Sequence, residues 1–277
     1  MTAPLRTRWE ALLRTVYSSR PAQDPTTVFV AAHPDDEVIG AGATLLRDAP
    51  RCVVVHVTDG APGDLVDARA AGFATREAYA VARRKEARDA ISLARELPVD
   101  IVSLDVEDQR ASESMDAIAS RLATVLREIG PALVVTHAYE GGHPDHDATC
   151  FAVHAACAAA EKVPVVEFTS YHDRQGGTRY GQFLDHPGAG APLAFELSPP
   201  EQSHKRQLFQ CYATQGEVLR HIPVNVERFR PAPAYDFSRP PHEGPLHYER
   251  FPWGMTGERW RALAAATMVG LRSAGRA

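Results

Sequence analysis

The sequence predicts an α/β fold built on a mostly parallel sheet with helices on both faces. Short apolar runs such as Thr27-Val28-Phe29-Val30 and Cys52-Val53-Val54-Val55 alternate with segments of helical periodicity. Continuous apolar runs are typical of parallel strands that are buried on both faces. Such units commonly form a doubly wound, Rossmann-like sheet with the strand order 3-2-1-4-5.

Five parallel strands alternate with helices in this prediction. The strands are expected at residues 27–32, 52–57, 100–104, 132–136 and 165–170. The helices are expected at residues 7–18, 38–47, 75–97, 112–129, 147–161, 201–215 and 256–272. Pro98 ends the long Ala-rich helix, and Ile118, Leu122 and Leu126 share one face of the helix after it.

The pattern changes after residue 170. Residues 175–187 and 194–197 predict a turn-rich hairpin region. Residues 222–253 contain seven prolines and no periodicity of a regular element, so we expect an ordered arm that packs over the body. A wall of the substrate site is the alternative interpretation of this arm. The prediction is one domain over residues 1–277, with a core at about 26–215 and the arm and last helix at about 216–277.

The composition argues against several classes of protein. A formal net charge of −5 leaves no basic footprint for nucleic acid. The four cysteines form no Cys-x-x-Cys pair, which favours a reduced compartment. The longest run without a charged residue, 148–160, is too short to span a bilayer, and the charged N-terminus leaves no signal-peptide core. We therefore expect a cytoplasmic protein without a membrane span; a homo-oligomer is left open.

Two short motifs follow two of the predicted strands. Ala32-His33-Pro34-Asp35-Asp36-Glu37 follows the first strand, and His143-Pro144-Asp145-His146 follows the fourth. In the order 3-2-1-4-5 these strands are neighbours at the switch point, where open α/β sheets bind their ligands. One such loop alone is more typical of a turn with an N-capping Asp. Two copies at one crevice predict a functional site.

The residue types in the motifs are those of a metal centre. A catalytic zinc takes three N or O ligands from the protein and keeps a position for water. His33 and Asp36 face the same side if a helix begins after Pro34, and His146 supplies a third ligand from the neighbouring loop. The sequence therefore predicts a Zn²⁺ site, although another divalent transition metal also suits these ligands.

The remaining members of the motifs are suited to proton transfer. Asp35 lies beside Asp36 and is free to accept a proton from an activated water, and His143 is a second acid–base group. Asp145 is a candidate for the carboxylate that orients an imidazole. These residue types predict hydrolysis with zinc-activated water and Asp35 as general base.

With these motifs the chain resembles the PIG-L/LmbE-like family of zinc-dependent N-deacetylases, which act on N-acetylglucosamine-type sugars. The resemblance covers roughly residues 26–215 and implies an acetylated amino-sugar substrate. It implies a zinc-binding set, namely His33, Asp36 and His146. It also implies that Asp35 is the general base, that His143 stabilises the oxyanion or protonates the amine, and that Asp145 orients His143.

Weaker parts of the resemblance lie outside the motifs. Arg83-Arg84-Lys85-Glu86 is similar to the family's Arg-x-x-Glu helix, and Lys205 with Thr214-Gln215 is similar to a C-terminal pattern. Arg83 and Asp108 fall where some members contact the sugar. Members that act on mycothiol precursors carry a tyrosine where this chain has Gly141. Tyr139 is the alternative residue whose side chain could enter the site in its place.

Two other functions share parts of these motifs. Two histidines and one carboxylate also describe a non-haem iron oxygenase, but that site typically uses His-x-Asp/Glu on an all-β scaffold, unlike His33-Pro34-Asp35-Asp36 here. A non-catalytic metal-binding module is the third hypothesis. A closed metal site does not need spare acid–base groups such as Asp35 and His143, so the hydrolase is preferred.

Other residues of the predicted core have structural interpretations. His56 and His154 are expected as packed or hydrogen-bonded core residues, whereas His137 at the end of the fourth strand is left open as a neighbour of the ligands. Gly40-Ala41-Gly42 has a faint likeness to a dinucleotide loop but follows an acidic motif that would repel a pyrophosphate. Close packing of a helix on the sheet is the preferred explanation of these glycines.

Overall fold

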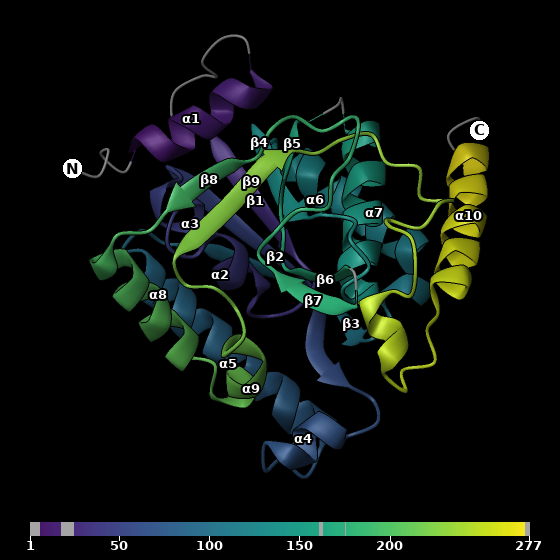
Figure 1. Cartoon of the computed structure of the whole chain (residues 1–277), viewed down its shortest axis with the longest axis horizontal. Coiled ribbons are helices and arrows are strands. Elements are labelled where there is room, and N and C mark those ends of the chain that lie inside the picture. Colours follow the sequence, from purple (N-terminus) through teal and green to yellow (C-terminus); the bar gives the residue numbers. More distant parts are fainter. Residues whose placement is uncertain (1–5, 18–24, 161–162, 175, 275–277) are drawn as a thin grey trace.

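The computed structural model describes residues 6–17, 25–160, 163–174 and 176–274. A central sheet runs through the molecule with helices on both of its sides (Figure 1). Its seven strands have the order β3-β2-β1-β4-β5-β9-β8. The first five of these contain the predicted order 3-2-1-4-5, which is confirmed.

The five parallel strands are β1 (Thr26–Ala31), β2 (Arg51–Pro62), β3 (Asp100–Asp108), β4 (Leu133–His137) and β5 (Val165–Phe168). β2 and β3 run on beyond the predicted ends at 57 and 104, with register shifts between them after His56. This extension carries the end of β3 to Asp108, beside the carboxyl end of β1.

Helices cover both faces of the sheet, as predicted. In order they are α1 (Arg6–Val16), α2 (Asp36–Ala41), α3 (Leu45–Asp48), α4 (Val66–Ala70), α5 (Arg76–Ala94), α6 (Met115–Ile129), α7 (Pro144–Ala159), α8 (Pro199–Gln210), α9 (Gly216–Leu219) and α10 (Gly257–Ala274). Val28 and Val30 of β1 join one core with α6, α7 and α10, while Phe29 joins a second core with α2, α5 and α8. The alternation of side chains along a strand produces these two layers.

Several helices differ from their predicted bounds. The predicted helix 38–47 is two short helices, α2 and α3, separated at residues 42–44, and 201–215 divides into α8 and the 3₁₀ turn η2 (Ala213–Gln215). A further 3₁₀ turn, η1 (Ala111–Glu113), precedes α6. α7 begins earlier than predicted because Pro144 occupies its first turn, where a missing N–H costs nothing. Residues 18 and 161, the ends of two predicted helices, lie outside the described residues.

The segment 222–253 contains a strand that the sequence did not predict. β9 (Val226–Pro231) pairs antiparallel with β5, and β8 (Leu193–Glu196) pairs with β9. Three charged side chains interrupt the apolar pattern of β9, and two of them, Glu227 and Arg230, are buried. Lys205 pairs with Glu227 at 2.8 Å and Glu167 pairs with Arg230 at 2.6 Å, so partners remote in sequence make this strand possible.

The rest of the C-terminal part is less regular. β6 (Tyr171–Arg174) and β7 (Gly177–Tyr180) form a separate hairpin, displaced from the predicted region 175–187. The arm after β9 contains the 3₁₀ turn η3 (His247–Arg250) and leads into α10. Among the described helices, none combines the length and the apolar character needed to cross a membrane.

Gly40 lies near the end of α2, in the segment Gly40-Ala41-Gly42. A Cβ at this position would overlap the ring of Phe168 on β5, so α2 lies against the sheet at a distance that a side chain would prevent. The prediction of close packing is thus confirmed for this glycine.

We expect Gly40→Ala to destabilise the protein by about 1–3 kcal/mol, because the added methyl overpacks the contact with Phe168. Urea denaturation measures the change. Gly270→Ala is the matched control, since Gly270 is an exposed residue of α10 with nothing near its Cβ, and the change should be neutral or stabilising by up to about 1 kcal/mol. Equal stability of the two variants would contradict the packing argument.

Candidate active site

The turn after β1 brings His33 and Asp36 to the same side. Asp36 begins α2, and its Oδ2 accepts the backbone N–H of His33 at 2.8 Å and lies 3.2 Å from His33 Nδ1. Asp35 between them has φ 153° and ψ −28°, a backbone conformation that is strained for a residue with a side chain. Strained positions of this kind cluster at functional sites.

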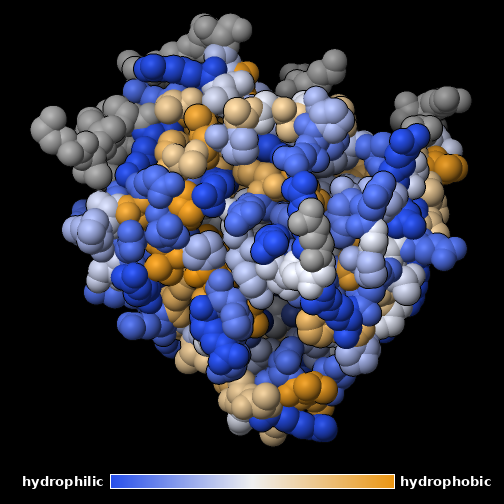
Figure 2. Space-filling view, viewed as in Figure 1, coloured by the Kyte–Doolittle hydropathy of each residue, from blue (hydrophilic) through white to orange (hydrophobic). Residues whose placement is uncertain are grey.

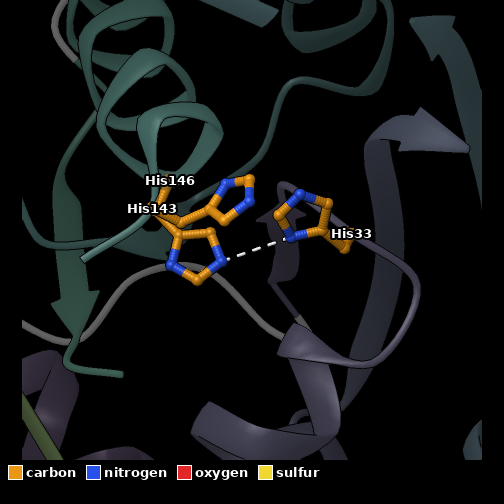
Figure 3. A group of neighbouring side chains, drawn as sticks. All are labelled: His33, His143 and His146. Atoms are coloured by element: carbon orange, nitrogen blue, oxygen red, sulfur yellow. Dashed lines mark hydrogen bonds between the residues drawn. The ribbon is translucent and has the colours of Figure 1, made fainter. Parts of the chain in front are cut away.

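The turn after β4 adds two imidazoles. His143 is the N-cap of α7, and its Nδ1 accepts the N–H of Asp145 at 3.2 Å. His146 lies in the first turn of α7, with its Nε2 3.2 Å from His33 Nδ1 and 3.2 Å from Asp36 Oδ1. Figure 3 shows the three imidazoles facing one another across the gap between the two motifs. The motifs therefore form one cluster.

The cluster has the donor set of a metal centre. Two ring nitrogens and one carboxylate lie 3.2 Å from one another, and all three side chains are buried. Imidazole and carboxylate ligands suit zinc and other divalent transition metals. The residues present thus fit a divalent metal ion.

Two carboxylates flank the other nitrogen of His33. Its Nε2 lies 3.1 Å from Asp108 Oδ1 and 3.5 Å from Asp145 Oδ2. The Asp145 carboxylate also accepts the backbone N–H groups of Gln109 at 2.6 Å and Ala111 at 3.1 Å. Despite the opposing effect of burial, the charge of His33 holds the pKa of Asp108 below its usual range. Both carboxylates thus lie against the ring of His33, and Asp145 also holds the loop after β3.

Arg83 of α5 reaches the first motif from the side. Its Nη2 donates to Asp35 Oδ2 at 3.1 Å and to the carbonyl of Pro34 at 3.0 Å, and its Nη1 donates to the carbonyl of Gly60 at 2.7 Å. Burial raises the pKa of Asp35 to about 8, although the Arg83 guanidinium opposes the shift. Gly60 has φ +67°, and a Cβ there would come within 2.9 Å of Arg83 Cζ.

Behind the motifs lie partners that sequence reasoning did not assign. Glu37 Oε2 accepts the N–H of Asp35 at 3.2 Å and lies 3.0 Å from His56 Nε2, while Tyr212 donates to Glu37 Oε1 at 2.9 Å. His56 is buried, as expected of a core residue. Glu37 belongs to the acidic run of the first motif, so the sequence drew attention to it. Its partners His56 and Tyr212 lie 19 and 175 positions away along the chain, and residue spacing does not reveal them.

His137 joins the cluster from the end of β4. Its Nε2 accepts the N–H of Ala32 at 3.0 Å and lies 3.4 Å from Asp36 Oδ2, and its ring stacks on His146 with centroids 4.1 Å apart. His137 is thus a neighbour of the predicted ligands, the interpretation that the sequence left open. The signal available in the sequence was its position at the carboxyl end of the strand.

Other residues named from the sequence have packing roles. Tyr139 donates to the carbonyl of Arg239 at 3.0 Å and stacks on Trp260, so its hydroxyl is engaged within the core. Glu86 accepts both the N–H and the hydroxyl of Thr214, which ties α5 to η2.

A second group of candidate ligands lies away from the motifs. Cys150, His154 and Glu167 offer ligand atoms within 4.8 Å of one another. However, Arg230 donates to Glu167 at 2.6 Å and Tyr235 donates to it at 2.8 Å. The guanidinium already balances this carboxylate and would repel a cation, so the group is a packed polar network.

Comparisons with known proteins identify the family of the chain. Residues 28–157 match the family model described as PIG-L, GlcNAc-PI de-N-acetylase. A 1D-myo-inositol 2-acetamido-2-deoxy-alpha-D-glucopyranoside deacetylase of Saccharopolyspora erythraea is 32% identical over 237 residues, which cover 74% of this chain and 76% of the relative. The chain belongs to the PIG-L/LmbE-like family of deacetylases. An enzyme of the same name from Mycolicibacterium smegmatis is 29% identical, over 50% of this chain and only 55% of the relative's length.

Solved structures of other deacetylases share the fold. A deacetylase of teicoplanin biosynthesis has a TM-score of 0.61 and 21% identity, covering 76% of this chain and 99% of its own. The N,N'-diacetylchitobiose deacetylase of Pyrococcus horikoshii has a TM-score of 0.54 and 17% identity, covering 84% of this chain and 94% of its own. The PIG-L family member described here thus has the mixed α/β architecture of these proteins.

We expect Asp108→Asn to weaken metal binding about 10–100-fold, because a neutral amide holds the ring of His33 less firmly than a carboxylate. Competition with a chelating dye measures the affinity. Asp105→Asn is the control, since this exposed carboxylate on the same strand accepts from Ser103 Oγ at 2.6 Å and lies 3.7 Å from Arg84 Nη1. Unchanged affinity in Asp108→Asn would show that Asp108 does not support His33.

Proposed function

We propose that this PIG-L family member is a zinc-dependent hydrolase that removes the N-acetyl group from an N-acetylated amino sugar or its conjugate. The observation that carries the proposal is the convergence of His33 Nδ1, His146 Nε2 and the Asp36 carboxylate, with Asp35 beside them. Relatives named as deacetylases of acetylated sugars support the substrate class.

His33, Asp36 and His146 would hold the Zn²⁺ ion. Bound there, zinc would supply Lewis-acid polarisation of the acetamide carbonyl and would lower the pKa of a water molecule. His137, stacked on His146 and bonded to the Ala32 amide, fixes the orientation of the third ligand.

Asp35 is proposed as the general base. Burial raises the pKa of this carboxyl in the metal-free protein, and a divalent cation beside it would lower that pKa toward the ionised form that a general base requires. Arg83 and Glu37 hold Asp35 at its side chain and its backbone N–H, respectively. These contacts support a positioning role for Arg83, in place of the sugar contact that the family resemblance implies.

His143 is proposed as the group that stabilises the negative charge on the carbonyl oxygen. Because its Nδ1 accepts the Asp145 N–H, the neutral ring carries its proton on Nε2. Burial lowers the pKa of His143 well below its usual value, which favours this neutral form. His143 Nε2–H therefore donates to the carbonyl oxygen as negative charge develops on it. Protonation of the leaving nitrogen completes the reaction, with the proton that Asp35 took from water.

Asp145 and Asp108 are proposed as positioning residues. The resemblance implies that Asp145 orients His143. The backbone N–H of Asp145 supports this role, because it donates to His143 Nδ1. Its carboxylate contacts His33 and the loop at 109–111 instead. Asp108 contacts His33 as well, so a sugar contact by Asp108 has less support than a role in fixing this ligand.

A screen of N-acetyl-hexosamine conjugates for released primary amine, with and without a chelator, tests the function. Asp35→Asn should lower kcat about 10²–10⁴-fold while bound metal stays near the wild-type level, because the base is lost and the ligands remain. Turnover is measured by amine derivatisation and bound metal by elemental analysis. Asp89→Asn, an exposed carboxylate of α5 that pairs with Lys85, is the control and should retain turnover.

Two outcomes would contradict these assignments. Near wild-type turnover by Asp35→Asn would remove Asp35 from the role of base. Amine release that persists in the metal-free protein would remove the metal from the reaction altogether.

A further inference from the structure

A row of aromatic rings links the two histidines of the second motif. Its members come from outside both motifs: Tyr171, His247, Phe251 and Trp253, here called the aromatic belt. Centroid distances from ring to ring are 5.7 Å (His146–Tyr171), 5.2 Å (Tyr171–His247), 5.3 Å (His247–Phe251), 4.5 Å (Phe251–Trp253) and 4.8 Å (Trp253–His143). Each distance is that of rings in contact.

The belt joins two parts of the chain that the catalytic proposal does not use. Tyr171 comes from β6, and the other three members come from η3 and the residues just after it. Figure 1 shows this yellow segment beside the β6–β7 hairpin, before the chain enters α10. Figure 2 shows the same face of the molecule hollowed below the hairpin.

The belt is exposed to solvent at Phe251, although this side chain is apolar. Phe251 is 40% exposed, and its ring stacks on Trp253 with an interplanar angle of 12°. A single exposed Phe is common on protein surfaces. A stacked Phe–Trp pair that leads from solvent to a histidine of the candidate active site is a shaped apolar surface, and such surfaces mark ligand-binding sites.

The belt is held rigidly in position. Asp173 of the hairpin lies 2.9 Å from His247 Nδ1 and 2.6 Å from Arg250 Nη2, so one buried carboxylate ties the arm to the hairpin. The backbone N–H of His247 donates to the carbonyl of Gly141 at 2.9 Å, in the loop before the second motif. Binding to a surface ordered in advance costs less entropy than binding to a mobile one.

We propose that the aromatic belt binds an apolar aglycone, aromatic or alkyl, attached to the acetylated amino sugar. The proposal rests on the proposed function, because that function requires the acetamide to lie beside Asp35 and His143. Trp253 contacts His143 directly, so a group carried on the same sugar falls within reach of the Trp253–Phe251 pair. Stacking against these rings then discriminates between conjugates that carry the same reactive amide.

The phenyl and methyl β-glycosides of N-acetylglucosamine test this, because they differ only in the apolar group. For the zinc-loaded wild-type enzyme we expect kcat/KM to favour the phenyl glycoside. In Phe251→Ala the ratio of the two kcat/KM values should fall about five- to tenfold, from loss of one aromatic contact. Val218→Ala, an exposed apolar residue of α9 outside the belt, should leave the ratio unchanged.

If Phe251 served only folding, Phe251→Ala would lower kcat/KM equally for both glycosides. The ratio of the two kcat/KM values would then stay unchanged, and this result would overturn the proposal. Calorimetric titration of the phenyl glycoside into the wild type and Phe251→Ala gives a readout that does not require turnover. The affinity for the phenyl glycoside should fall by a similar factor in Phe251→Ala. Equal affinities of the two proteins, or no binding by either protein, would overturn the proposed role of the belt. Failure of the wild type to release amine from both glycosides, with the affinity difference intact, would instead count against the proposed function.

Discussion

The parallel pairing of β1 with β4 is the constraint on which the candidate active site depends. Thr27, Val28 and Phe29 pair with Leu133, Val134 and Val135, so both strands end at the same level of the sheet. His33 and His146, 113 positions apart, therefore come within 3.2 Å. A shift of one residue would turn every side chain of β1 to the opposite face and separate the two motifs. The bond from the Ala32 N–H to His137 helps to fix this register.

The convergence of the strand ends also gathers several carboxylates in the buried candidate active site. Asp35, Asp36, Asp108 and Asp145 are all buried within the two motifs and the end of β3. Removing several carboxylates from water is costly unless cations balance them, and Arg83 contacts only one of the four. A divalent cation between His33, Asp36 and His146 would offset much of this cost. The demands of metal binding and of stability thus coincide, and the strained backbone of Asp35 is kept by the contacts around it.

The sequence predicted the strand order and the convergence of the motifs because both follow from local patterns and the topology of α/β sheets. It did not predict β9, because Glu227 and Arg230 look exposed until Lys205 and Glu167 are seen beside them. The surroundings of the candidate ligands were missed for a similar reason. Contacts such as Asp108 with His33, or Tyr212 with Glu37, depend on where β3 and α8 end in space, which residue spacing does not encode.

X-ray absorption spectroscopy of the zinc-loaded protein tests the central claim most directly, because it reports which atoms surround the ion. We predict one zinc per chain, with only nitrogen and oxygen neighbours at about 2.0–2.2 Å and the scattering pattern of two imidazoles. A sulfur neighbour at about 2.3 Å would contradict the account, because it would locate the ion at a cysteine such as Cys150 in place of His33, Asp36 and His146.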